Sequence, residues 1–262
     1  MTLTRISEVI HEWMGWCPMT AAVRNGKQEQ NTASKPASDG DSGPVERRAV
    51  LYMRLAWVVI GLSWLVSIAA LPYLPEIMPV HWNIFGEADG FSSRLVGAFT
   101  LPIILTLTAI VLMVLPRFEK MRQSIDRVRD IYNIAIFVTA SFLLAMQVMV
   151  LLSSVGMDLP VVVIFPMLFG FLFIVLGGLF PHIARNAHVG IRLPWTIRDE
   201  NVWRMTHEHG GPVFVIAGVL MVLESPVAGM YAMSLMLFIF MCTIVYITVW
   251  SYRLSKSVSM KV

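Results

Sequence analysis

Two polar islands in an otherwise apolar chain hold the side chains that could do chemistry. The first island, residues 74–94, contains the imidazole of His81 and, after it, the carboxylates of Glu87 and Asp89. They could bind a cation or a basic peptide, but one histidine with two carboxylates is a weak signal for a metal site. The alternative is a loop that satisfies its own hydrogen bonds. In that case Asp89 caps a turn, Asn83 bonds to the backbone, and Trp82 lies at a membrane interface.

The second island, residues 190–211, is a tight turn followed by a predicted helix. Thr196 and Asp199 have the spacing of a capping box, and Gly210 and Gly211 are expected to end the helix. Trp203 and His207 lie one turn apart, and therefore on one face of that helix.

Arg192 is a permanent cation that precedes Pro194 and Trp195 in the second island. Its guanidinium could bind an anion, a lipid phosphate or an acidic partner. The alternative is an interfacial helix in which Trp195 and Trp203 are aromatic anchors and the arginines extend toward the lipid headgroups.

Four histidines gather in or just before the second island: His182, His188, His207 and His209. Their spacings match no known zinc motif, and two helical histidines at i and i+2 point about 200° apart. We therefore predict no metal site and no cofactor. Because no motif of a hydrolase, a metalloprotease or a phosphate-binding loop is present, we also predict no catalytic residue.

The composition indicates the medium that holds the two islands. Of the 262 residues, 56% are hydrophobic and 14% are charged, against roughly 45–50% and about 25% in soluble domains. This composition predicts an all-α, polytopic membrane bundle with the lipid bilayer as its partner. The net charge of +3 fits basic cytoplasmic loops, and we predict no nucleic-acid partner. Two cysteines argue against a disulfide framework.

Apolar runs define about six membrane spans. Five reach the roughly 20 residues that a helix needs to cross the hydrocarbon core: 51–71, 95–115, 131–155, 159–180 and 227–250. The other run, 212–223, is too short alone, so it must borrow residues from either side or be re-entrant. The basic residues concentrate in alternate loops and at both ends of this region, which predicts cytoplasmic termini. The first island then faces outward and the second faces the cytoplasm.

The chain divides into four predicted parts. Residues 1–23 form an amphipathic segment, either lying on the membrane or serving as a leader with no role of its own. Residues 24–48 are a disordered linker, because they contain little that could be buried. Residues 49–130 hold two spans and the first island. Residues 131–262 hold four spans and a cytoplasmic loop, 181–211.

The first island resembles the P-x-H-W-N-x-x-G-x-x-D-x-x-x-x-K/R signature of the DUF1648 region. The matching residues are Pro79, His81, Trp82, Asn83, Gly86 and Asp89, while Arg94 replaces the usual lysine and keeps its charge. The second island resembles the signature G-I-R-T-P-W-T, then V-W, then T-H-x-x-G-G of SdpI-like membrane proteins. Leu193 departs from it, where the family often has threonine.

The resemblance implies a six-span protein of a prokaryotic plasma membrane that gives immunity to, or senses, a membrane-active peptide toxin. It also implies a cytoplasmic regulator as a second partner. One alternative is a transporter, with Gln147 and proline-broken spans lining a path. A membrane enzyme is a further alternative, but it would need His81 and His207 on the same side of the bilayer. The candidate ligand- or partner-binding residues are His81, Trp82, Asn83, Gly86, Glu87, Asp89, Arg94, Arg192, Pro194, Trp195, Thr196, Trp203 and His207.

Overall fold

The computed structural model describes residues 44–118, 125–126 and 128–259. Its long helices are α2 (Pro44–Ala70), α3 (Arg94–Val114), α5 (Arg129–Ser154), α6 (Val161–Leu179), α8 (Glu200–Glu224) and α9 (Ala232–Ser259). The other elements are the strands β1 (Ile77–Trp82) and β2 (Ala88–Ser93) and the short helix α7 (Pro194–Arg198). The predicted amphipathic segment lies outside the described residues, as does the predicted linker up to residue 43. Helix α2 begins at Pro44, inside the stretch that we expected to be linker.

Six of these helices are long and apolar enough to cross a membrane, which confirms the predicted number of spans. The fifth span is α8, which runs unbroken through Gly210, Gly211 and Pro212. The predicted helix end at Gly210 and Gly211 is therefore wrong. These glycines serve close packing instead, because a Cβ added to Gly211 would lie 2.8 Å from the Gly177 carbonyl oxygen.

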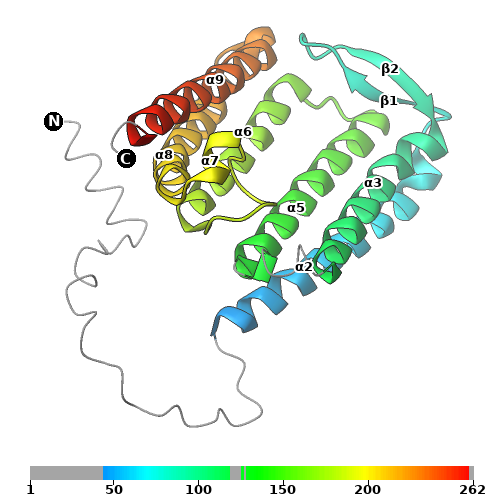
Figure 1. Ribbon diagram of the computed structural model, residues 1–262. Coiled ribbons are helices and arrows are strands. Elements are labelled where there is room, and N and C mark those ends of the chain that lie inside the picture. The colour runs from blue at the N-terminus through cyan, green and yellow to red at the C-terminus, as the bar shows by residue number, and fades with distance from the viewer. Residues whose placement is uncertain (1–43, 119–124, 127, 260–262) are drawn as a thin grey trace. The chain divides into compact units, whose positions relative to one another are not determined.

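Successive long helices run in opposite directions, so the connections alternate between two ends of the bundle (Figure 1). The chain between α2 and α3 lies at one end, which we call the hairpin end. The short α7, between α6 and α8, lies at the other, which we call the α7 end. His81 and His207 therefore lie at opposite ends, and the two islands do not form a shared reaction centre.

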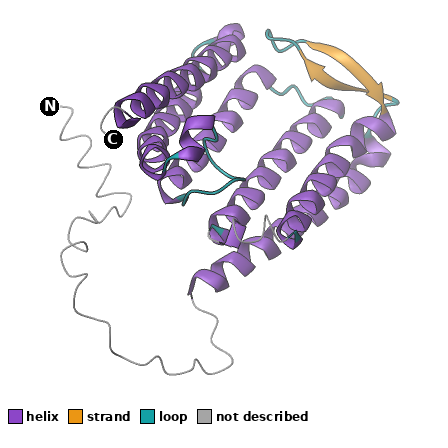
Figure 2. Ribbon diagram, in the orientation of Figure 1, coloured by secondary structure: helices purple, strands orange, loops and turns teal. Residues whose placement is uncertain are grey.

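The first island is a β-hairpin and not the irregular loop expected of an all-α fold (Figure 2). Strands β1 and β2 pair in antiparallel fashion, with Ile77 opposite Ser93 and His81 opposite Gly90. Met78 is fully buried, and a Cβ added to Gly97 of α3 would lie 3.0 Å from its sulfur atom. Packing against α3 thus turns a short stretch, whose strand pattern is interrupted by Pro79, into a strand.

Gln147 is buried between α5 and α2, where α2 satisfies its side-chain amide. Its oxygen accepts a hydrogen bond from the Ser63 hydroxyl, and its nitrogen donates to the Ser63 carbonyl (2.8 Å) and the Ser67 hydroxyl (2.7 Å). Such bonds between membrane helices are typically worth about 0.6 kcal/mol and at most about 2 kcal/mol. Gln147 therefore joins two helices, and it does not line a path as the transporter alternative required.

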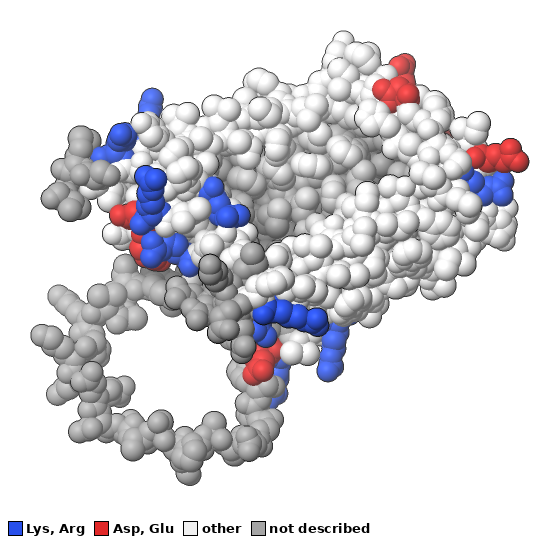
Figure 3. Space-filling view, turned by 45° about the vertical axis from the view of Figure 1, so that its right-hand side comes forward, with Lys and Arg blue, Asp and Glu red and all other residues white. Residues whose placement is uncertain are grey.

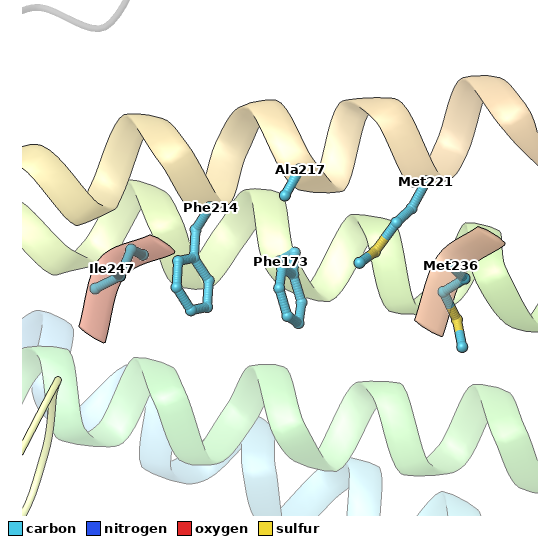
Figure 4. Packing of buried hydrophobic residues seen from close by; sticks show 6 residues of the cluster. All are labelled: Phe173, Phe214, Ala217, Met221, Met236 and Ile247. Carbon is cyan, nitrogen blue, oxygen red and sulfur yellow. The ribbon is translucent and has the colours of Figure 1, made fainter. Parts of the chain in front are cut away.

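The C-terminal half of the bundle packs around aromatic and aliphatic side chains of α6, α8 and α9 (Figure 4). The rings of Phe173 and Phe214 stack with centroids 4.8 Å apart. Lipid chains are as apolar as these side chains, so close packing and not exclusion from water holds such helices together.

Charged side chains separate strongly along the bundle (Figure 3). In this view the blue side chains gather toward one end, and a wide uncharged belt separates them from the few charges at the other. Among the described residues, Arg94 is the only Lys or Arg at the hairpin end. The uncharged belt has the character of a surface in contact with lipid.

Candidate functional site

The turn of the hairpin is organised by Asn83. Its side-chain oxygen accepts hydrogen bonds from the backbone N–H groups of Phe85 (2.9 Å) and Glu87 (3.1 Å), and its nitrogen donates to the Glu87 carboxylate (3.0 Å). Gly86 adopts φ +80°, which favours glycine. The predicted bonding of Asn83 to the backbone is confirmed.

His81 and Asp89 form an exposed pair across the two strands. The imidazole Nδ1 lies 2.5 Å from a carboxylate oxygen, and the two side chains are 71% and 46% exposed. Asp89 thus pairs with a histidine and does not cap a turn, which corrects that prediction. Arg94 donates from Nε to the Pro75 carbonyl (3.3 Å), so it ties the start of α3 to the chain ahead of β1.

Trp82 lies beside this pair in the sequence but packs into the bundle. It packs against two apolar clusters, one that includes Val150 of α5 and one made up of Met149 of α5, Val161 of α6 and Met233 of α9. We expected an interfacial anchor. Trp82 is instead half-buried, next to a register shift between His81 and Trp82 in the strand pairing.

Beneath the hairpin lies an apolar cavity of about 800 Å³. Helices α3, α5, α6 and α9 supply its walls, and residues 80–84 of the hairpin supply its roof. Four methionines and three phenylalanines line it: Met146, Met149, Met233, Met236, Phe142, Phe165 and Phe169. Flexible methionines fit irregular apolar partners well, so the cavity can adapt to the shape of an apolar group.

The described charges around the hairpin end are mostly negative. The carboxylates are Glu76, Glu87, Asp89, Asp158 and Glu224, against the single guanidinium of Arg94. A cation that approaches this end meets a net attraction, while the cavity below offers an apolar surface. The arrangement suits a ligand with both basic and apolar groups.

The second island is organised by a buried histidine. His207 is 1% exposed, and its Nε2 accepts the backbone N–H of Ile191 at 2.9 Å. Its Nδ1 lies 2.8 Å from the Trp203 carbonyl oxygen and must therefore carry the proton. The Trp203 ring stacks on the imidazole at 4.2 Å, and its Nε1–H donates to the Ile183 carbonyl. Trp203 and His207 share one face of the helix, as predicted.

Gly190 and Thr196 complete the set of contacts that hold the second island against α8. Gly190 adopts φ +113°, and a Cβ there would lie 2.4 Å from His207 Nε2. The Thr196 hydroxyl accepts the Leu193 N–H (2.9 Å) and donates to the Ile191 carbonyl (2.7 Å). Leu193 contributes its backbone to this turn, so the departure from the family pattern leaves the hydrogen bond intact.

The predicted capping box of Thr196 and Asp199 is wrong. Asp199 is itself the N-cap of α8, with its carboxylate accepting the N–H groups of Asn201 (2.8 Å) and Val202 (2.9 Å). Thr196 is already used in the turn before it.

The candidate residues of the second island differ sharply in accessibility. Thr196, Trp203 and His207 are buried and hold the loop on α8, whereas Arg192 and Pro194 are exposed. Trp195 is half-buried and donates to the Ser251 hydroxyl (3.0 Å). Within the described part of the chain, no three metal-binding side chains gather.

The cavity residues were missed by sequence reasoning. Met146 and Met149, Met233 and Met236, and Phe165 and Phe169 recur at helical spacing, but membrane helices are apolar on every side. Helical spacing alone therefore could not show which face lines a cavity.

The fold and its uncharged belt define a polytopic helical membrane protein of six spans. Two family matches refine this description: DUF1648, a domain of unknown function, matches residues 58–106, and the SdpI/YfhL protein family matches residues 182–251. The chain is therefore similar to the SdpI-like membrane proteins, with the DUF1648 match ahead of the SdpI match in its sequence.

A named relative agrees with this assignment. Immunity protein SdpI of Bacillus subtilis (strain 168) is 25% identical over 203 residues, which cover 77% of this chain and 95% of that protein. No solved structure matches the chain.

Proposed function

We propose that this protein gives a prokaryotic cell immunity to a membrane-active peptide, which it binds at the hairpin end of the bundle. The match to the SdpI/YfhL protein family and the similarity to an immunity protein support the immunity role. The apolar cavity beneath the hairpin carries the proposal for the kind of ligand.

Cavity and hairpin fit the chemistry of such a peptide. A peptide that attacks membranes presents apolar side chains to lipid, and basic residues draw it to anionic membrane surfaces. The methionine- and phenylalanine-lined cavity receives the apolar side chains, while the carboxylates of Glu87 and Asp89 attract the basic ones. Binding at this site removes the peptide from the bilayer before it can do damage.

The proposal requires the hairpin end to face outward, as the concentration of Lys and Arg at the α7 end favours. Reporter fusions after Gly86 and after Arg198 test this orientation. An alkaline phosphatase reporter should be active only at Gly86 and a fluorescent reporter only at Arg198. Activity of the same reporter at both positions would refute the orientation.

Loss of the His81–Asp89 pair should reduce protection without loss of protein. We expect cells that express His81→Ala or Asp89→Asn to be killed by roughly tenfold less peptide than cells with the wild type. This is the effect of one lost charge-assisted hydrogen bond. An exposed ion pair contributes at most about 1 kcal/mol to stability, so the protein level should not change. The measurement is growth of a peptide-sensitive strain that expresses the full chain, against a panel of cationic membrane-active peptides.

The matched control is His182→Ala, which removes an exposed imidazole at the α7 end. Protection should survive that change. If the wild-type chain protects against no peptide of the panel, the immunity proposal loses its support for these ligands. If His81→Ala protects as fully as His182→Ala, binding does not involve the His81–Asp89 pair.

Docking of a cytoplasmic regulator at the α7 end stays a prediction, with exposed Arg192 as its candidate contact.

A further inference from the structure

A second cavity, of about 400 Å³, lies at the α7 end. Helix α7 and the first turn of α8 form one wall, and the last turns of α9 form the other. Each wall contributes a cation, Arg198 from α7 and Lys256 from α9. The proposed peptide site lies at the opposite end of the bundle, so this cavity has no part in it.

The two cations are available to a ligand. Both side chains are exposed, and the Arg198 guanidinium makes no hydrogen bond or ion pair with any residue in the described part of the chain. Lys256 lies over the Tyr252 ring, with its nitrogen 5.6 Å from the ring centroid. The only carboxylate in the lining is that of Asp199, and it already accepts two backbone N–H groups as the cap of α8. The cavity therefore presents two positive charges, and its one carboxylate is already hydrogen-bonded to the backbone of α8.

Aromatic contacts fix the distance between the walls. Trp195 donates from Nε1 to the Ser251 hydroxyl (3.0 Å), and its ring meets the edge of Tyr252 at 5.2 Å. Trp195, Tyr252 and Lys256 thus form a continuous series of contacts from α7 to α9. A site whose walls are already held in place loses little entropy when a ligand binds.

The remaining lining includes Ser255 and the apolar side chains of Val202 and Val258. The cavity also lies at the polar end of α9, just beyond the apolar run that ends at Trp250. Tryptophan and tyrosine favour this depth, at the level of the lipid headgroups. A ligand here meets cations and apolar surface at once, which matches the junction between a phosphate headgroup and its acyl chains.

We propose that this cavity binds the headgroup of an anionic phospholipid. Arg198 and Lys256 hold the phosphate from opposite sides, and the first methylenes of the acyl chains lie along Val258. Basic pockets at the cytoplasmic end of membrane helices bind anionic headgroups in this way. Arg192, which the sequence offered as one candidate for anion binding, does not line the cavity.

Native mass spectrometry of the full-length chain in detergent tests the proposal. Titration with phosphatidylglycerol should show one site that phosphatidylcholine does not fill. Arg198→Gln and Lys256→Gln should each weaken binding roughly fivefold, and the double variant roughly thirtyfold. Lys256→Arg should keep the affinity. The matched control, Arg117→Gln, removes an exposed cation at the same end but outside the cavity, and should have no effect.

Several results would overturn the proposal. Equal binding of both lipids, or an equal loss in Arg117→Gln, would mean that the basic end attracts lipid without a defined site. Full competition by the same concentration of inorganic phosphate would assign the cavity to a free anion. Preference for a polyglutamate peptide over phosphatidylglycerol would assign it to an acidic protein. Unfolding midpoints measured in phosphatidylcholine should be equal for all variants, which separates lost binding from lost folding.

Discussion

Replacing Gly177 with alanine is expected to destabilise the bundle strongly, whereas the same change at Gly178 is not. A Cβ at Gly177 would lie 2.7 Å from the Gly211 carbonyl oxygen and 2.8 Å from the Val215 nitrogen, both on the backbone of α8. At Gly178 it would meet nothing within 4 Å. Backbone atoms cannot rotate away, so α6 and α8 must separate. We expect a loss near the upper end of overpacking effects, about 3 kcal/mol.

The measurement is the thermal unfolding midpoint of the full-length protein in detergent micelles. Gly178→Ala should unfold at the same temperature as the wild type or higher, because alanine favours a helix by about 1 kcal/mol over glycine. Equal midpoints for the two variants would show that α6 and α8 are not in close contact. A second contact, between Gly170 and Gly218, offers a repeat of the test, because a Cβ at Gly218 would lie 2.4 Å from the Gly170 carbonyl oxygen.

These glycine contacts also show where the sequence misled us. A pair of glycines before a proline is typical of a helix end, so Gly210, Gly211 and Pro212 indicated an interruption between the second island and the fifth span. In the structure the helix continues through these residues. Gly211 is needed there because α6 approaches too closely to leave room for a side chain. A local pattern cannot distinguish a glycine that ends a helix from one that admits a neighbouring helix.

The number of spans, by contrast, was predictable because it does not depend on contacts between helices. Membrane thickness sets a minimum length for each span, and that length can be read from the sequence without any knowledge of packing. The hairpin depended on tertiary contacts, since Met78 must pack against Gly97 of α3. The cavity was hidden because its methionines and phenylalanines are as apolar as the residues that face lipid.

Filling the cavity should abolish protection while the fold persists. Met146 lines the cavity from α5, and tryptophan at this position would occupy space that the proposed peptide needs. We expect the peptide concentration that halves growth to fall at least about tenfold, the change that about 1.4 kcal/mol of lost binding energy produces. Measured in the survival assay described above, the variant should approach the sensitivity of cells without the protein.

Leu152→Trp is the matched control, since Leu152 lies on the same helix, is 37% exposed and does not line the cavity. Lipid can accept the larger side chain there, so protection should match the wild type. Protection that survives Met146→Trp would separate the immunity function from the cavity and leave the hairpin surface as the site of binding. Met146 lies inside the cavity, whereas the His81 side chain, in the cavity roof, is 71% exposed, so the two kinds of variant test the interior and the exposed rim of one proposed site.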